Sequence, residues 1–310
     1  MAEVSFPKSV NDYDCRNEPS NYTMEIRHMM HGFGDCSEPL IESAKIIEDV
    51  VLRQMRIIVN RACEIADKRG SNVVNAEDFL FLLRKDKVKL QRLLKYLRLK
   101  EFKSSVSKLM PSESSDDIPD FDRVDSQLHK RPYDGFLNLI DTTGELLENS
   151  SVIDHVKHNR HLRAEMMSRK MDEARYIEFS KARSISFANK NRHKFSDWIC
   201  PDGDIVISKQ GYSILGYFAY ETVAQIIDLT LLVRQDQFKI HGDSIDRLRL
   251  SFFNPYTYKP YQHSKGNVTK PITPSELNEA LRRYWSPQLD MAAPFHRWSM
   301  RNQHIKLFSC

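Results

Sequence analysis

The chain contains 310 residues, of which 41% are hydrophobic and 28% are charged, and only 10 are glycine. This composition is typical of a helix-rich protein with one large domain or two small ones, and a formal net charge of +4 is too small to indicate nucleic-acid binding by itself. Because residues 1–10 do not resemble a signal peptide and no apolar run reaches the roughly 18 residues of a membrane span, we expect a soluble intracellular protein.

The first predicted elements are a short helix and a long one. The apolar side chains of residues 26–33 indicate about two helical turns, which glycine then ends. The long helix starts near residues 37–38, with Pro39 in its first turn, and stops at Gly70. A helix of this length with an unbroken apolar seam needs a partner along its whole length. The seam recurs about every 3.6 residues, at Leu40, Ala44, Ile47, Val51, Met55, Ile58, Ala62 and Ile65.

Three further features complete the N-terminal part of the chain. Val73 and Val74 form a β-branched pair that suits a brief extended segment, and Asn75 then caps a short helix. Residues 84–103 carry nine Lys or Arg side chains, with leucines along one side, which predicts a basic amphipathic helix. We interpret the basic side of this helix as a solvated face, and contact with an acidic or nucleic-acid partner is the alternative.

An acidic, proline-containing stretch separates this part from the next. Residues 112–125 hold six acidic side chains against one basic residue, Arg123, which is the pattern of a linker. Residues 136–147 and 156–184 have the patterns of helices, and we expect them to bridge the two parts.

The C-terminal part begins with the same layout as the first. Residues 187–199 predict a short helix and residues 200–204 a loop. A second long helix follows, and its apolar seam again recurs about every 3.6 residues, at Leu215, Ala219, Val223, Ile226, Thr230 and Val233.

A longer loop and a last short helix complete the repeat. Residues 238–270 form an insertion rich in aromatic residues and proline, either a docking surface or a packed loop. Thr273 and Glu276 then have the spacing of a capping box, with Pro274 at the first helical position. The apolar face of this helix consists of Leu277, Ala280, Leu281 and Tyr284.

A long helix crossed by a short helix at each end is the plan of the histone fold, and this chain contains it twice. One copy cannot bury its own seam, so each copy needs a second one, although periodicity alone also admits an ordinary helical bundle. We therefore predict an all-α fold, with two histone folds in one chain that form an intramolecular histone-like pair, and with linking helices. The predicted pairing core is Ile47, Val51, Met55, Ile58, Leu215, Val223, Ile226 and Val233.

The residues at these positions resemble a known family. Residues 73–83 are similar to the second loop and third helix of a histone fold. The Spt-three family, the double histone-fold subunits of the SAGA transcription coactivator, is resembled over residues 22–103, 134–150 and 170–285. Its halves are also similar to a pair of TBP-associated factors in TFIID. The motifs that carry the resemblance are E-D-F-L-F-L-L-R-K-D-K, L-L-K-Y-L, A-Y-E-T-V-A-Q-I-I-D-L-T-L-L-V-R-Q-D and E-A-L-R-R-Y.

This resemblance implies a nuclear coactivator subunit that scaffolds a SAGA-type complex and recruits TATA-binding protein (TBP) to promoters. It implies other SAGA subunits as partners, and membership of TFIID is an alternative. In histone folds, an acid at the position of Asp78 pairs with an arginine, here replaced by Ser71, so Lys68 or Arg69 must reach it instead. The domains implied are an N-terminal histone fold at 22–103, a linker with bridging helices at 104–185, a C-terminal histone fold at 186–286 and a tail at 287–310.

Catalytic, cofactor and metal motifs are absent from the sequence. It contains no G-x-S-x-G, no H-E-x-x-H and no phosphate-binding loop, so we predict no enzymatic activity and no cofactor. His155, His158 and His161 do not converge on one ion, because steps of three spread them around a helix. The five cysteines contain no C-x-x-C spacing, which favours reduced thiols over a zinc cluster.

Binding of DNA or chromatin is the main alternative function. Paired histone folds contact DNA where their first and second loops meet, yet Asp35, Glu38, Asp202 and Asp204 place acidic charge at those edges, so direct DNA contact is disfavoured. TBP has a basic face that suits such acidic loops better. The candidate TBP contacts are charges that we expect on the open side of the last helix, Glu276, Glu279, Arg282 and Arg283.

Overall fold

The computed structural model describes residues 21–109, 133–141, 154–187, 192–200, 205–239, 270–285 and 307–309. These residues are almost entirely helical, so the predicted all-α class is confirmed. None of the helices in these ranges is long and apolar enough to cross a membrane. In chain order the elements are α1 (Thr23–Phe33), α2 (Ile41–Lys68), β1 (Val73–Val74), α3 (Ala76–Leu82), α4 (Lys87–Leu109), α6 (Asp134–Ile140), α7 (His155–Ser168), α8 (Glu173–Ser184), α9 (Arg192–Ile199), β2 (Val206–Ile207), α10 (Lys209–Lys239) and α12 (Pro274–Trp285).

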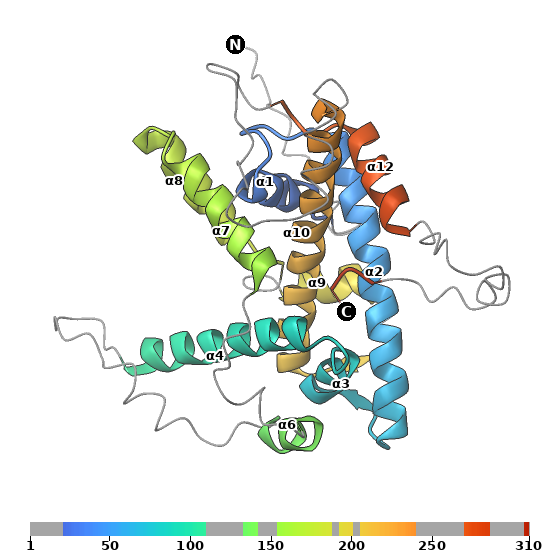
Figure 1. The fold of residues 1–310 in the computed structure, drawn as a ribbon. Coiled ribbons are helices and arrows are strands. Elements are labelled where there is room, and N and C mark those ends of the chain that lie inside the picture. The colour runs from blue at the N-terminus through green and yellow to red at the C-terminus, as the bar shows by residue number, and fades with distance from the viewer. Residues whose placement is uncertain are drawn as a thin grey trace, which may run out of the picture.

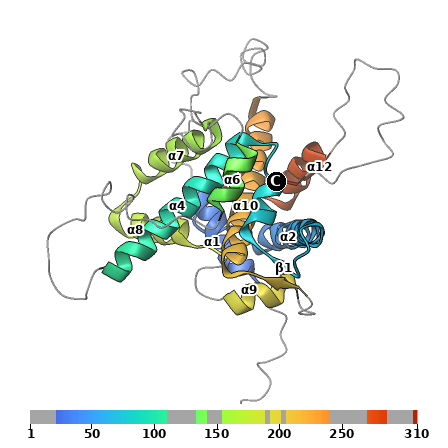
Figure 2. The same ribbon diagram turned by 90° about the horizontal axis from the view of Figure 1, so that it is seen from below.

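Two long helices, α2 and α10, form the centre of the molecule (Figure 1). They lie side by side, and the short helices α1, α3 and α12 each contact both of them. The two views place α4, α7 and α8 on one side of α10, and α2 and α12 on the other (Figures 1 and 2). The short–long–short order α1–α2–α3 is repeated by α9–α10–α12.

The boundaries of α2 differ at one end from the prediction. The helix begins at Ile41, so Pro39 lies before it and not in its first turn. Pro39 instead accepts a hydrogen bond from Arg27 Nε at 2.8 Å, which joins this segment to α1. The prediction for the other end is confirmed, because Gly70 has a φ of 73° and the chain leaves the helix there.

The linking helices are shorter than the sequence pattern indicated. The predicted helix at 136–147 runs from Asp134 to Ile140 in α6, and residues 142–147 lie outside the described ranges. The span 156–184 is divided into α7 and α8, because the Asp172 side chain accepts a hydrogen bond from the Arg175 backbone and starts a new helix. The short helix expected at 187–199 starts at Arg192.

One core contribution comes from the extreme C-terminus. The Phe308 ring stacks on the Tyr284 ring of α12, with 4.0 Å between the ring centroids. The Phe308 backbone N–H donates to Gln54 Oε1 of α2 at 3.2 Å, and Leu307 accepts a hydrogen bond from the Tyr284 hydroxyl. Residues 307–309 therefore return to the centre of the molecule.

Candidate functional site

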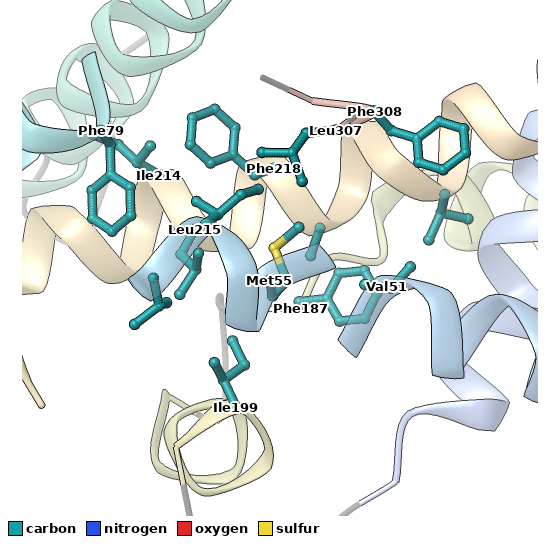
Figure 3. Packing of buried hydrophobic residues seen from close by; sticks show 14 of the residues in the cluster. Val51, Met55, Phe79, Phe187, Ile199, Ile214, Leu215, Phe218, Leu307 and Phe308 are labelled. Atoms are coloured by element: carbon teal, nitrogen blue, oxygen red, sulfur yellow. The ribbon is translucent and has the colours of Figure 1, made fainter. Parts of the chain in front are cut away.

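The surface that joins the two long helices is built from the predicted seams. Seven of the eight predicted pairing residues are fully buried and Val233 is 2% exposed. Figure 3 shows Val51 and Met55 from α2, with Leu215 and Phe218 from α10, in the layer where the two helices meet. Removal of apolar surface from water stabilises a folded protein by about 25 cal/mol per Å². Each seam is therefore stable only when the other long helix covers it.

Beyond the seams, two loop junctions join the halves, and the first is a short parallel sheet. In it Val73 pairs with Val206 and Val74 with Ile207, which connects the segment after α2 to the segment before α10. The Ser208 backbone N–H extends the junction by donating to the Val74 carbonyl at 2.9 Å. Since β1 follows one long helix and β2 precedes the other, the two long helices run in opposite directions here.

The second junction lies at the other end of the long helices. The Ile272 backbone N–H donates to Asp35 Oδ1 at 2.9 Å, and Ser43 Oγ donates to the Ile272 carbonyl at 2.7 Å. These contacts connect the segment around the start of α2 to the segment before α12. The first junction joins the segment after α2 to the segment before α10, and the second joins the segment before α2 to the segment after α10. Each long helix therefore meets a loop of the other half at both of its ends.

The position of Asp35 corrects one argument made from the sequence. Asp35 is 1% exposed, and burial raises the pKa of its carboxyl group more than the backbone hydrogen bonds from Cys36 and Ile272 lower it. The Asp35 carboxyl group is therefore turned into the protein and not displayed at the surface, although Glu38 in the same loop is exposed. Asp202 and Asp204 lie outside the described residues.

A matching pair of ionic contacts occupies the same place in each half. Arg69 contacts Asp78 at 2.9 and 3.2 Å, so Arg69 supplies the cation that the sequence left open between Lys68 and Arg69. In the other half, Arg234 of α10 contacts Glu276 of α12 at 2.6 and 2.7 Å.

Both acids also cap the helix in which they lie. Asp78 accepts from the Asn75 backbone N–H at 2.8 Å, and Glu276 accepts from the Thr273 backbone N–H at 2.9 Å. The capping box predicted at Thr273 is therefore confirmed. Each acid thus holds its short helix against its long helix by the same three-part arrangement of cap, acid and arginine.

The candidate TBP contacts on α12 do not all lie on its open side. Glu276 is 9% exposed and is held by Arg234, so its placement on the open side was wrong. The reason is that the side chain at the third position of a capped helix folds back towards the start of the helix, where Glu276 accepts from the Thr273 backbone N–H. Arg282 and Arg283 are exposed, and both contact Glu279 at 2.7 Å, while Arg283 also contacts Asp236. Their hydrogen bonds lower the pKa of Glu279 to about 2.

Comparison with known proteins agrees with this geometry. Residues 20–111 match the family model described as the 18-kDa subunit of transcription initiation factor IID. The chain is 28% identical to the SAGA complex subunit Spt3 of Drosophila melanogaster, over 86% of this chain and 68% of that protein. The SAGA complex subunit Spt3 of Schizosaccharomyces pombe is also 28% identical, over 86% of this chain and 91% of that protein. This chain is therefore similar to Spt3 subunits along most of its length.

The similarity of this chain to TFIID subunits is confined to one half. Transcription initiation factor TFIID subunit 13 of Arabidopsis thaliana is 42% identical, over 80 residues that are 26% of this chain and 62% of that protein. The N-terminal part therefore carries a histone-fold domain. The Spt3 relatives, in contrast, align with both halves.

One feature of this chain was missed from the sequence, an arginine network at the junction of α4, α7 and α10. Arg92 of α4 contacts Asp154 at 2.6 Å and Glu221 of α10 at 3.0 Å. Arg160 of α7 contacts Glu221 at 2.9 Å and Asp228 at 2.6 Å, and Arg163 pairs with Asp228 as well. We define the arginine network as Arg92, Arg160, Arg163, Asp154, Glu221 and Asp228.

The arginine network revises the interpretation of the basic helix. The leucines at 90, 93, 94 and 97 are buried as predicted, but Arg92 is turned inward and is not part of a solvated face. Burial alone would lower the pKa of Arg160, but Glu221 and Asp228 outweigh it and raise that pKa. Helical periodicity could not find this network, because its partners lie 61 to 129 positions apart in the sequence.

Of the three histidines considered as ligands, none takes part in a metal cluster in the described part of α7. No group of three His, Cys, Asp or Glu side chains is placed to hold an ion there or elsewhere in the described residues. His155 and His158 are exposed, and His161 lies at the edge of a cavity next to α4.

Proposed function

We propose that this chain is a nuclear subunit of a SAGA-type transcription coactivator, and that it works by binding and not by catalysis. The observation that carries the proposal is the alignment of 84–86% of the chain with proteins named as SAGA complex subunit Spt3 from fly and yeasts. A subunit of TFIID is a weaker alternative, because the relatives with that name align with 26% of the chain.

The proposed mechanism is scaffolding by two paired histone folds in one polypeptide. The N-terminal fold spans residues 22–103 and the C-terminal fold 186–286, with linking helices at 104–185 and a tail at 287–310. Three observations support a second fold, namely the repeated helix order, the two mirrored loop junctions, and the repeated cap–acid–arginine arrangement at Asp78 and Glu276.

TBP is the proposed partner of the exposed face of α12. After the correction at Glu276, the candidate contacts are Glu279, Arg282 and Arg283. We expect Glu279→Lys to leave the fold intact, because this side chain lies on the outer face of α12, and to lower capture of purified TBP about tenfold, because a cation then faces the basic surface of TBP. The matched control is Glu178→Lys, which reverses an exposed acid of α8 on the other side of α10. Equal TBP capture by both variants would remove α12 from the TBP surface.

The experiment that tests the function is purification of the tagged full chain from nuclear extract at moderate salt, followed by mass spectrometry. We expect the acetyltransferase coactivator subunits, together with TBP. Recovery of core histones or DNA without those subunits would favour the chromatin-binding alternative. Recovery of TFIID subunits alone would favour the other one.

A further inference from the structure

A cavity of about 340 Å³ lies on the side of α10 that faces away from α12. One wall is aromatic, with Tyr96 of α4 and Tyr217 and Tyr220 of α10. The Tyr96 and Tyr217 rings are stacked, with centroids 4.7 Å apart, and Phe33 packs on Tyr220 at 4.9 Å. We call this cavity the tyrosine groove. Its volume is within the range of about 300–1,000 Å³ that ligand sites in proteins occupy.

The charge around the tyrosine groove is positive in excess. The arginine network at its floor is balanced, with three arginines against three carboxylates. Lys157 and Arg183 also line the groove, and neither has an acidic partner within ion-pair distance in the described ranges. Arg183 is exposed and Lys157 is half-buried. The groove therefore offers two cations that form no ion pair among the described residues, although Asp154 and Glu221 lie near enough to Lys157 to offset part of its charge.

The excess positive charge helps to lower the pKa of two groups in the groove. Burial lowers the pKa of Lys157, and the nearby ammonium of Lys95 lowers it further. His161, also on the wall, has a pKa lowered by burial and then by Lys157 and Arg183. A carboxylate bound beside Lys157 and Arg183 would relieve this repulsion, because it supplies the missing opposite charge.

A polar atom without a partner lies in the same wall. The hydroxyl of Ser186 is buried, lines the groove, and has no hydrogen-bond partner among the described residues. Buried hydroxyl groups are normally paired, since leaving one unpaired costs about 1–3 kcal/mol. The segment that carries Ser186 leaves α8 in an extended conformation at Ile185.

From these observations we infer that the tyrosine groove binds an acidic peptide segment of a partner protein. One bulky apolar side chain of the peptide packs against Tyr96, Tyr217 and Tyr220, and flanking Asp or Glu side chains contact Lys157 and Arg183. A polar group of the peptide pairs with the Ser186 hydroxyl. A nucleic acid fits less well, because its phosphates need a row of unpaired cations, and the arginines here are already paired with carboxylates.

The inference goes beyond the proposed function, since the groove is lined by residues of α4 and α7, which lie on the opposite side of α10 from α12 (Figures 1 and 2). It is tested on the full chain with a phage library of random 12-residue peptides. We expect the selected peptides to share one aromatic or leucine residue next to two or more acidic residues. A synthetic peptide with that sequence then serves as the probe for fluorescence anisotropy.

Two variants and a control make the measurement specific. Lys157→Glu with Arg183→Glu should weaken binding of the probe at least about tenfold, because attraction becomes repulsion. Ser186→Ala should weaken binding while the unfolding temperature does not fall, since its hydroxyl has no partner to lose. The control, Lys170→Glu with Lys181→Glu, changes the same charge outside the groove and should leave the affinity unchanged.

Three outcomes would overturn the inference. Selection of no acidic motif, or equal affinity of the groove variant and the control, would show that the groove is not a peptide site. Tighter binding of a single-stranded oligonucleotide than of the peptide would assign the groove to nucleic acid. If the peptide binds only after the acidic residues of 112–125 are replaced by asparagine or glutamine, that segment of this chain is itself what occupies the groove.

Discussion

At the scale of single residues, the buried contact between Arg234 and Glu276 joins α12 to α10. Both side chains are 11% exposed, and Arg234 also donates to the carbonyls of Lys270 and Pro271 at 2.8 Å. Burial alone raises the pKa of Glu276, but the hydrogen bonds from Arg234 and from the Thr273 backbone outweigh it and hold the pKa below its ordinary value of 4.5.

We expect Glu276→Gln to lower the free energy of unfolding by about 2–3 kcal/mol at pH 7, because the buried guanidinium of Arg234 loses its opposite charge. Urea titration followed by circular dichroism measures this change. The control is Glu279→Gln on the outer face of the same helix, where solvent screens the ion pairs with Arg282 and Arg283, so that the loss should be much smaller. Similar losses in the two variants would contradict the role of the buried pair.

The same residue predicts a pH dependence. Because the pKa of Glu276 is lower in the folded state than in the unfolded chain, its contribution is complete above about pH 5.5 and is lost as the pH falls through the folded-state value. The difference in stability between the wild type and Glu276→Gln should therefore be constant from about pH 6 to about pH 8. It should shrink as the pH falls towards about 3. A difference that grows with acid would be the opposite of this expectation.

At the scale of elements, the close approach of β2 and α10 depends on a residue without a side chain. A Cβ atom on Gly211 would lie 2.7 Å from Ile207 Cγ2 and 3.2 Å from Phe79 Cε2. Neither neighbour can move away easily, since Ile207 belongs to the two-stranded sheet and Phe79 is fully buried.

We expect Gly211→Ala to lower the free energy of unfolding by about 1–3 kcal/mol through overpacking at this junction. Gly135→Ala in α6 is the matched control, because a Cβ atom there would meet nothing within 4 Å. That control should leave stability unchanged or raise it by up to about 1 kcal/mol, since alanine favours a helix. Thermal unfolding of the two variants side by side gives the comparison.

The seam between α2 and α10 makes a second prediction at this scale. Ile226 is fully buried among the apolar residues of the seam, so Ile226→Asp places a carboxylate where the described residues offer it no cation. An unpaired buried charge costs several kcal/mol, and we expect helicity and cooperative unfolding to be lost. Circular dichroism with native helicity and a sharp transition in this variant would contradict the seam.

At the scale of the whole molecule, the two halves depend on each other for their cores. The apolar cluster runs without a break through α1, α2, α3, α4, α9, α10 and α12, so neither half encloses a core of its own. The arginine network adds a polar link between α4, α7 and α10.

We therefore expect fragments 1–118 and 119–310 to fold only together. Each fragment alone should show weak helicity by circular dichroism, and mixing them should restore the signal and give one complex on size-exclusion chromatography. Fragment 119–310 with Ile226→Asp provides the control, since mixing it with fragment 1–118 should not restore the signal. A stable, helical fragment 1–118 by itself would show that the halves fold independently.

Much of the architecture could be predicted from local patterns. Periodic apolar residues predict α2 and α10, and Gly70, Asn75 and Thr273 mark helix ends, because these signals act between residues that are near in the sequence. The eight seam residues are buried for the same reason. The inward positions of Asp35, Arg92 and Glu276 could not be predicted, since a charged residue in a helical or loop pattern looks like a surface residue until its distant partner is known.

The sequence by itself therefore determined the helix order, the repeat of that order, and the faces of the long helices that must be buried. Only the tertiary structure decided which loops meet, which acid pairs with which arginine, and where a groove is left open beside Tyr96 and Tyr217. The physical reason is the range of the interactions. Helix periodicity and capping act over about four residues, whereas Asp35 and Ile272 are 237 positions apart and meet only when the two halves have packed together.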